Sequence, residues 1–170
     1  MPRSRKRISV EARSFGGDDQ HVNASKDMPE GNDRNMVRFM EEAIPEDHQA
    51  ALLIRQVITF TATYDHVVDE DEYTTDQVHV MVNVLLNGMP LNGFYVKYLA
   101  VLLPIILNAI HAWRYADTCP EYRIKVSDVL SELGCSMLYL SGGMSRLNEH
   151  GNHWRDLTLN LLKASDTRGK

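Results

Sequence analysis

The stretch Tyr98-Leu-Ala-Val-Leu-Leu-Pro-Ile-Ile-Leu-Asn-Ala-Ile-His-Ala-Trp113 decides the fold of this chain. It contains no Lys, Arg, Asp or Glu between Lys97 and Arg114. A helix that is apolar nearly all round is either the centre of a bundle or a membrane span. These 16 residues would form a helix of about 24 Å, shorter than the ~30 Å hydrocarbon core of a bilayer. We therefore predict a central apolar helix over about 94–117, with a small membrane-associated protein as an alternative.

Two polar side chains and a proline interrupt this apolar run. Pro104 removes a backbone donor inside the helix and predicts a kink there. Asn108 and His111 are three residues apart, so they share a helix face. A buried polar group without a partner costs about 1–3 kcal/mol. We therefore predict that Asn108 and His111 belong to a buried polar network, with a ligand pocket as the alternative.

The rest of the chain after residue 34 also has helix-type periodicity. Thr74-Thr-Asp-Gln77 has the form of a capping box, and Gly88 follows as a candidate helix end. Gly143 is a second candidate end, and Gly151 predicts an interruption of the last helix. The helices predicted around the central one cover residues 35–44, 46–68, 74–88, 120–142 and 144–164.

These patterns predict an all-α fold with five or six helices in one bundle-like domain. A chain of 170 residues with 44% hydrophobic residues is long enough for one domain with a working core. Residues 1–34 have few apolar side chains and no periodicity, so they cannot offset an ordering cost of ~1–2 kcal/mol per residue. We predict a disordered basic arm over 1–34, the helical domain over 35–164 and a disordered tail over 165–170.

The net charge of −5 conceals a separation of charge along the chain. Residues 56–96 contain six acidic residues and no Lys or Arg, whereas residues 1–13 contain five basic residues and one acidic residue. The acidic total argues against a protein whose whole surface coats nucleic acid. The basic residues 3–7 could instead contact phosphates or an acidic protein surface. The predicted arm contacts are Arg3, Arg5, Lys6 and Arg7.

The acidic middle of the chain offers a surface that would accept such an arm. Its predicted members are Asp65, Asp69, Glu70, Asp71 and Glu72. The arm of one copy could reach this surface on another copy, because extended chain spans up to ~3.3 Å per residue. We therefore expect a protein partner or self-association. Nucleic acid is a further expected partner, through residues 1–13 only.

An enzyme is the main alternative to an interaction protein. Asp65, His66, His79 and His111 are weak candidates for the ligands of a divalent metal in a metal-dependent hydrolase. In helical phosphohydrolases with His and Asp ligands, His comes directly before Asp in the sequence. This chain has Asp65 before His66, so the order does not match. No motif for a catalytic nucleophile with a neighbouring base is present. We therefore expect no catalytic residue, no metal and no cofactor.

The location expected from the sequence is intracellular. No apolar signal-peptide core follows the basic residues 3–7, and Cys119 and Cys135 match neither a disulfide scaffold nor a zinc knuckle. The basic cluster also has the form of a nuclear-import signal. The sequence thus predicts a non-enzymatic helical interaction or assembly protein. A structural or accessory protein of a virus or mobile element would suit this architecture, with the virion as a further location.

Overall fold

The structure, a computed structural model, describes residues 31–69, 74–116 and 120–166. Within these ranges the side chains of residues 65, 66, 68, 69, 113–116, 120–128 and 161–166 are not described. All regular elements in the described ranges are helical, which confirms the all-α prediction. They are α1 (Asn32–Ala43), α2 (His48–Asp69), α3 (Thr75–Asn83), a π-helical turn η1 (Val84–Gly88), α4 (Met89–Leu91), α5 (Gly93–Lys97), α6 (Leu99–Ala116) and α7 (Pro120–Asp166).

Local capping chemistry sets several helix starts. Asp47 Oδ1 accepts a hydrogen bond from the backbone N–H of Gln49 at 3.1 Å and caps the start of α2. The capping box predicted before α3 is present: Thr74 Oγ1 accepts from Gln77 N at 3.2 Å, and Gln77 Oε1 accepts from Thr74 N at 2.7 Å. Pro120 occupies the first position of α7, where its missing N–H costs nothing.

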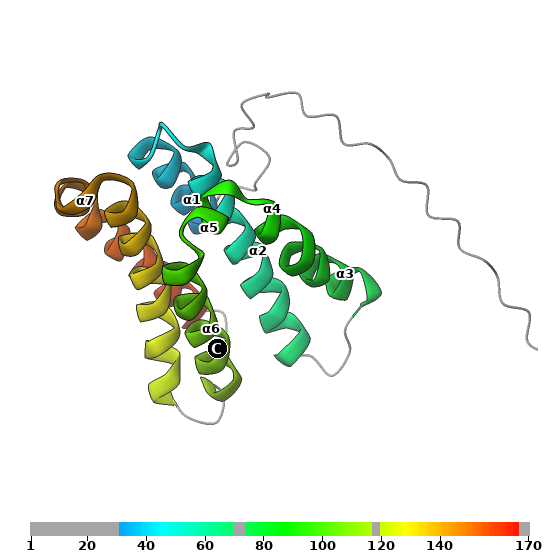
Figure 1. Ribbon diagram of the computed structural model, residues 1–170. Helices are drawn as coiled ribbons and strands as arrows, with labels where there is room; N and C mark the ends of the chain where they lie inside the picture. The colour runs from blue at the N-terminus through cyan, green and yellow to red at the C-terminus, as the bar shows by residue number, and fades with distance from the viewer. Residues whose placement is uncertain (1–30, 70–73, 117–119, 167–170) are drawn as a thin grey trace, which may run out of the picture.

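The long element α7 is two helical arms joined at Gly143. Gly143 has φ 66° and ψ −158°, a conformation essentially restricted to glycine, so the chain turns back on itself there as predicted. Figure 1 shows residues 120–142 running beside α6 and the chain then turning back over itself. Gly151 does not interrupt the second arm. It is helical and buried, and a Cβ there would lie 3.0 Å from Leu147 Cδ1.

Gly88 is likewise not a helix end. It keeps right-handed helical dihedrals, and α3 continues through η1 into α4. A Cβ on Gly88 would lie 3.0 Å from Gln56 Nε2, so the missing side chain allows close approach to α2. The helix ends instead at Asn92, whose ψ of 113° is extended and separates α4 from α5. A second break follows at Tyr98, between α5 and α6, while Pro104 lies inside α6. Tertiary contact, rather than glycine's turn preference, explains Gly88.

The core forms where α1, α2, α5, α6 and both arms of α7 meet. Trp154 is fully buried, and its indole N–H donates to the carbonyl of Leu130 at 3.1 Å, which joins the two arms of α7. α2 meets α6 and α7 around a small apolar void lined by residues such as Val57, Ile106 and Leu133. Each fully buried large apolar side chain contributes about 1.5–3 kcal/mol relative to its exposed state.

The ends of the helical region differ slightly from the expected boundaries. α1 begins at Asn32, within the predicted arm, and α7 reaches Asp166, within the predicted tail. Residues 1–30 lie outside the described part of the chain, so the predicted disorder of the arm is not addressed. Residues 167–170 also lie outside it.

Candidate functional site

One face of α6 is exposed, although the helix contains almost only apolar residues. Its opposite face is buried through Leu102, Ile105 and Ile106 against the core. The sequence had suggested a central helix enclosed by the bundle, but α6 is buried on one side only. The large apolar side chains left exposed on α6 are Leu99 (41%), Val101 (44%), Leu103 (36%) and Leu107 (44%).

The predicted buried polar network of Asn108 and His111 is wrong. Both side chains are exposed, on the same side of α6 as Leu107. Neither side chain needs a protein partner there, because water can satisfy its polar atoms. Both of these polar residues therefore lie on the solvent-exposed side of α6, near the end of the apolar run.

A different asparagine is the buried polar link, and sequence reasoning missed it. Asn92 is 1% exposed, and its Oδ1 accepts from the N–H of Tyr95 at 2.9 Å to cap α5. Its Nδ2 donates to the carbonyl of Gln49 at 2.9 Å and so ties α5 to α2. The available signal was local: an asparagine directly before Gly93 is a favoured helix N-cap.

The segment from α3 through η1 is apolar but unburied. None of its residues from Thr75 to Gly88 is buried, although Val80, Val82, Leu85 and Leu86 are all large apolar side chains. A nine-residue helix is marginal in water without tertiary packing. α3 packs against α2, yet these four apolar side chains stay exposed. A concentration of exposed apolar side chains is typical of an interaction surface.

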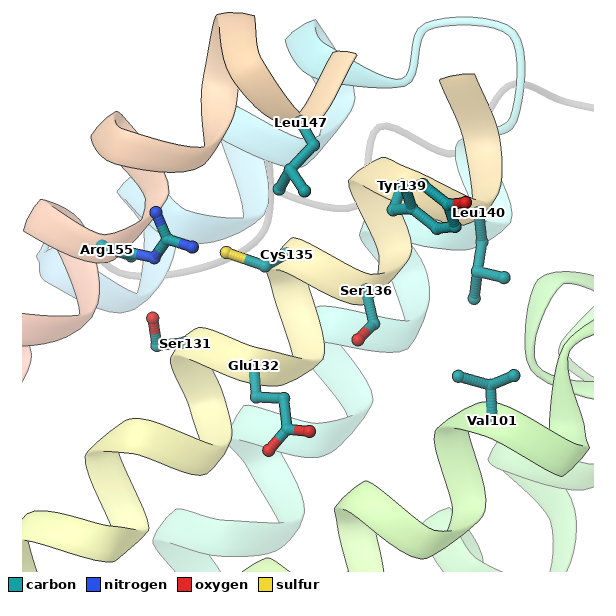
Figure 2. Close-up of a pocket in the computed structure, with 9 residues that line it drawn as sticks. All are labelled: Val101, Ser131, Glu132, Cys135, Ser136, Tyr139, Leu140, Leu147 and Arg155. Carbon is teal, nitrogen blue, oxygen red and sulfur yellow. The ribbon is translucent and has the colours of Figure 1, made fainter. Parts of the chain in front are cut away.

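A groove of about 620 Å³ lies between α6 and the two arms of α7. Figure 2 shows Val101 on the α6 side, Ser131, Glu132 and Ser136 on the first arm, and Leu147 and Arg155 on the second arm. Tyr98 Oη donates to the carbonyl of Leu140 at 3.0 Å and holds the start of α6 against the first arm. The groove is open to solvent and mixed in polarity.

Cys135 lies in this groove and is the free cysteine among the described residues. Figure 2 shows its sulfur directed toward Arg155. Burial raises the pKa of the Cys135 thiol, and the charge of Arg155 and a hydrogen bond with Ser131 oppose that shift only in part. The thiol therefore stays protonated near neutral pH, which is the less reactive form.

The histidines of the second α7 arm pack against an aromatic ring. The Phe39 ring centroid lies 6.0 Å from that of His150 and 5.2 Å from that of His153. The same ring lies 5.8 Å from the Trp154 ring. These contacts connect α1 to α7 and give both histidines a packing role.

The structure describes two of the four side chains predicted as candidate metal ligands. His79 on α3 and His111 on α6 are exposed, while the side chains of Asp65 and His66 lie outside the described set. Within the described part of the chain, no group of three His, Cys, Asp or Glu residues could hold a metal ion. The metal-hydrolase alternative remains a prediction, because half of its ligand set is not described.

The predicted arm and its acidic acceptor lie largely outside the described residues. This holds for Arg3, Arg5, Lys6 and Arg7 and for Glu70, Asp71 and Glu72. The backbones of Asp65 and Asp69 belong to the last turns of α2, with Asp69 as its final residue. The acceptor surface would therefore adjoin the start of α3, where Asp76 is exposed in the first turn.

None of the helices in the described residues combines the length and the apolar character needed to cross a bilayer. Comparison with models of protein families, with curated proteins and with solved structures found no match to this chain.

Proposed function

We propose that this chain is a non-enzymatic interaction protein that assembles through its apolar helix faces and its basic N-terminal arm. One observation carries the proposal. Ten of the thirteen exposed large hydrophobic side chains in the described residues fall between Val80 and Leu107, on α3 to α6 and the turns between them. Scattered apolar side chains on a surface need no explanation, but a concentration in one segment is typical of an interaction site.

The charge distribution supports a role for the arm. Residues 3–7 are basic, and Ile8 and Val10 follow them directly. The proposed acceptor has the complementary composition: Asp65 and the acidic residues 69–72 precede the exposed apolar side chains of α3 and η1. An arm with positive charges followed by apolar residues complements an acidic edge followed by an apolar helix face.

The acceptor belongs to a neighbouring copy in this proposal. Residues 8–30 could span on the order of 75 Å when extended, which exceeds the dimensions of one small domain. The same four basic residues could instead neutralise phosphates of nucleic acid, with a salt slope of roughly −3.6 for four contacts on B-DNA. An intracellular, nuclear or virion location stays a prediction with either partner.

Removing the arm tests this function. We expect deletion of residues 1–13 to weaken self-association at low salt and to have little effect at high salt, because exposed charges are screened there. Sedimentation equilibrium at several NaCl concentrations would measure the change. The matched control neutralises Lys163, Arg168 and Lys170, which removes basic charge from the other end of the chain.

The acceptor is tested by the opposite change. Replacing Asp69, Glu70, Asp71 and Glu72 with their amides should weaken low-salt association to a similar degree, and the arm deletion should then add little. If both changes leave association unaltered at low salt, the arm has no role in assembly. If only the arm deletion matters, and it acts on binding to a DNA duplex, the arm's partner is nucleic acid.

A further inference from the structure

The exposed face of α6 contains two parallel rows of side chains. Leu99, Leu103 and Leu107 form one row at intervals of four residues, and all three are exposed. Ala100, Pro104 and Asn108 form the neighbouring row, also at intervals of four and also exposed. Rows of this spacing are the ridges that pack between helices. A ridge of leucines thus lies beside a row with shorter side chains, Ala100 and Pro104 followed by the polar Asn108.

This face contains no permanently charged side chain, and its polar residues Asn108 and His111 follow Leu103 toward the end of the helix. No Lys, Arg, Asp or Glu lies between Lys97 and Arg114, and His111 is the single titratable side chain of the run. Burying the face therefore requires no desolvation of a permanent charge. Two copies would also bring no like charges together. The acidic surroundings of α3, by contrast, would repel a second copy of α3.

The leucine row is symmetric about Leu103. In an antiparallel pair of α6 helices, Leu103 meets Leu103, and Leu99 of each copy meets Leu107 of the other. We propose that two copies of this chain pack α6 against α6 in this way, around a two-fold axis beside Leu103. Such an interface uses the same patch on both copies. The leucine ridge of each helix then lies in the groove beside Ala100 and Pro104 of the other.

The chain's own arm is a poorer occupant of this face. Residues 1–30 contain few large apolar side chains, such as Ile8, Val10, Phe15 and Val22, and many charged ones. Covering an uncharged leucine ridge with that segment would bury charges without partners. A second α6 supplies a ridge of matching length and no charge. The arm is better matched to the acidic acceptor.

The size of the face indicates a weak dimer. Residues 99–111 form a strip about 20 Å long and about 10 Å wide, which is well below the ~800 Å² that each partner buries in a typical stable interface. The α6 pairing therefore rests on the proposed assembly function and adds to the arm contacts. The dissociation constant of the α6 pair should change little with salt, unlike that of the arm contact.

Charged substitutions at Leu103, which lies beside the proposed two-fold axis, test the pairing. Leu103→Glu and Leu103→Lys should each raise the dimer dissociation constant by about tenfold or more, because like charges meet across the axis. An equimolar mixture of the two should recover dimers, since Glu then faces Lys. Leu107→Glu mixed with Leu99→Lys provides a second pair at the flanks. The full-length chain at high salt, followed by sedimentation equilibrium, isolates this contact from the arm.

The controls distinguish a folding defect from a loss of pairing. Leu159→Glu and Leu159→Lys change another exposed leucine, on α7 (47% exposed against 36% for Leu103), and should leave the dimer intact. Circular dichroism should show unchanged helix content in every variant. A wild-type chain that stays monomeric at high concentration overturns the pairing, and so do Leu103 variants that behave like the Leu159 variants. Loss of association on arm deletion, with Leu103→Glu dimerising normally, would retain the assembly function and refute the α6 interface.

Discussion

Gly134 shows how one missing side chain allows the two arms of α7 to meet. It is buried in the first arm, and a Cβ at this position would lie 2.0 Å from Cε2 of Trp154 on the second arm. Glycine inside a helix usually destabilises it by about 1 kcal/mol relative to alanine. At position 134 the indole fills the space that a methyl group would need, so glycine is favoured over alanine there.

We predict that Gly134→Ala destabilises the protein by about 1–3 kcal/mol, because the added methyl group overpacks the contact with Trp154. Urea unfolding followed by circular dichroism would measure it. Gly93→Ala is the matched control, since a Cβ there would make only an ordinary contact at 4.0 Å with Gln49 Cγ. A Gly134→Ala protein as stable as wild type would contradict the close approach of the two arms.

Cys135 gives a second prediction at this scale. Because burial raises the pKa of its thiol, alkylation by iodoacetamide near neutral pH should be slower than for an exposed thiol. The rate should rise with pH and continue to rise beyond the range where an unperturbed thiol has levelled off. A Cys119→Ser background isolates the signal, which mass spectrometry can follow. Fast alkylation at neutral pH would contradict the assigned protonation state.

At the scale of elements, an ion pair fastens the α7 turn to the α1–α2 connection. Arg146, just after the turn at Gly143, donates from Nη1 to Glu46 Oε1. The hydrogen bond from Arg146 lowers the pKa of Glu46 below its usual value. Glu46 is about half exposed, so the pair is screened and contributes no more than about 1 kcal/mol.

The pH dependence of Glu46→Gln follows from the direction of that shift. A lowered pKa in the folded state gives stability that is present above the unfolded pKa of ~4.3 and is lost as the pH falls through the folded value. Glu46→Gln should therefore destabilise the protein by up to about 1 kcal/mol at neutral pH and have no effect in strong acid. Thermal melting across pH would show it. Glu42→Gln, a surface carboxylate that pairs with Arg38 one turn away, is the control.

Local signals were enough to predict several elements. The capping box of Thr74 and Gln77 depends only on residues within one turn, and so does the helix start at Pro120. The predicted end at Gly143 is correct because its positive φ is a property of glycine itself. Gly88 was misread because it is small for contact with Gln56 on α2, which the sequence does not place nearby. Gly151 was misread because the helix simply continues through it, with Leu147 one turn before.

The exposed face of α6 could not be found from periodicity. A helix with apolar residues on every side has no polar stripe to mark the solvent, so the sequence suggested burial all round. The assignment of Asn108 and His111 to the interior followed from that suggestion and failed with it. The residues proposed for the arm and its acceptor rest on charge alone, and most of them lie outside the described ranges.

At the scale of the whole molecule, charge and apolar surface are separated along the chain. The proposed interfaces are correspondingly distinct: the arm contact responds to salt, and the α6 contact responds to the shape and charge of one helix face. A chain with both could form pairs through α6 and connect those pairs through its arms. Weak individual contacts would then combine into a larger assembly, because linked binding sites raise each other's effective concentration.

The meeting of α1 with the second arm of α7 has a consequence for how this domain could be re-engineered. Asn32, the first residue of α1, donates from Nδ2 to the carbonyl of Asn160 at 3.4 Å, so the two ends of the helical region lie side by side. The end of α7 lies six residues, or about 9 Å of helix, beyond Asn160. Ends this close together favour tolerance of circular permutation. A short linker could therefore join the end of α7 to α1, with new termini opened between α2 and α3. The basic arm could then be attached directly beside its proposed acidic acceptor.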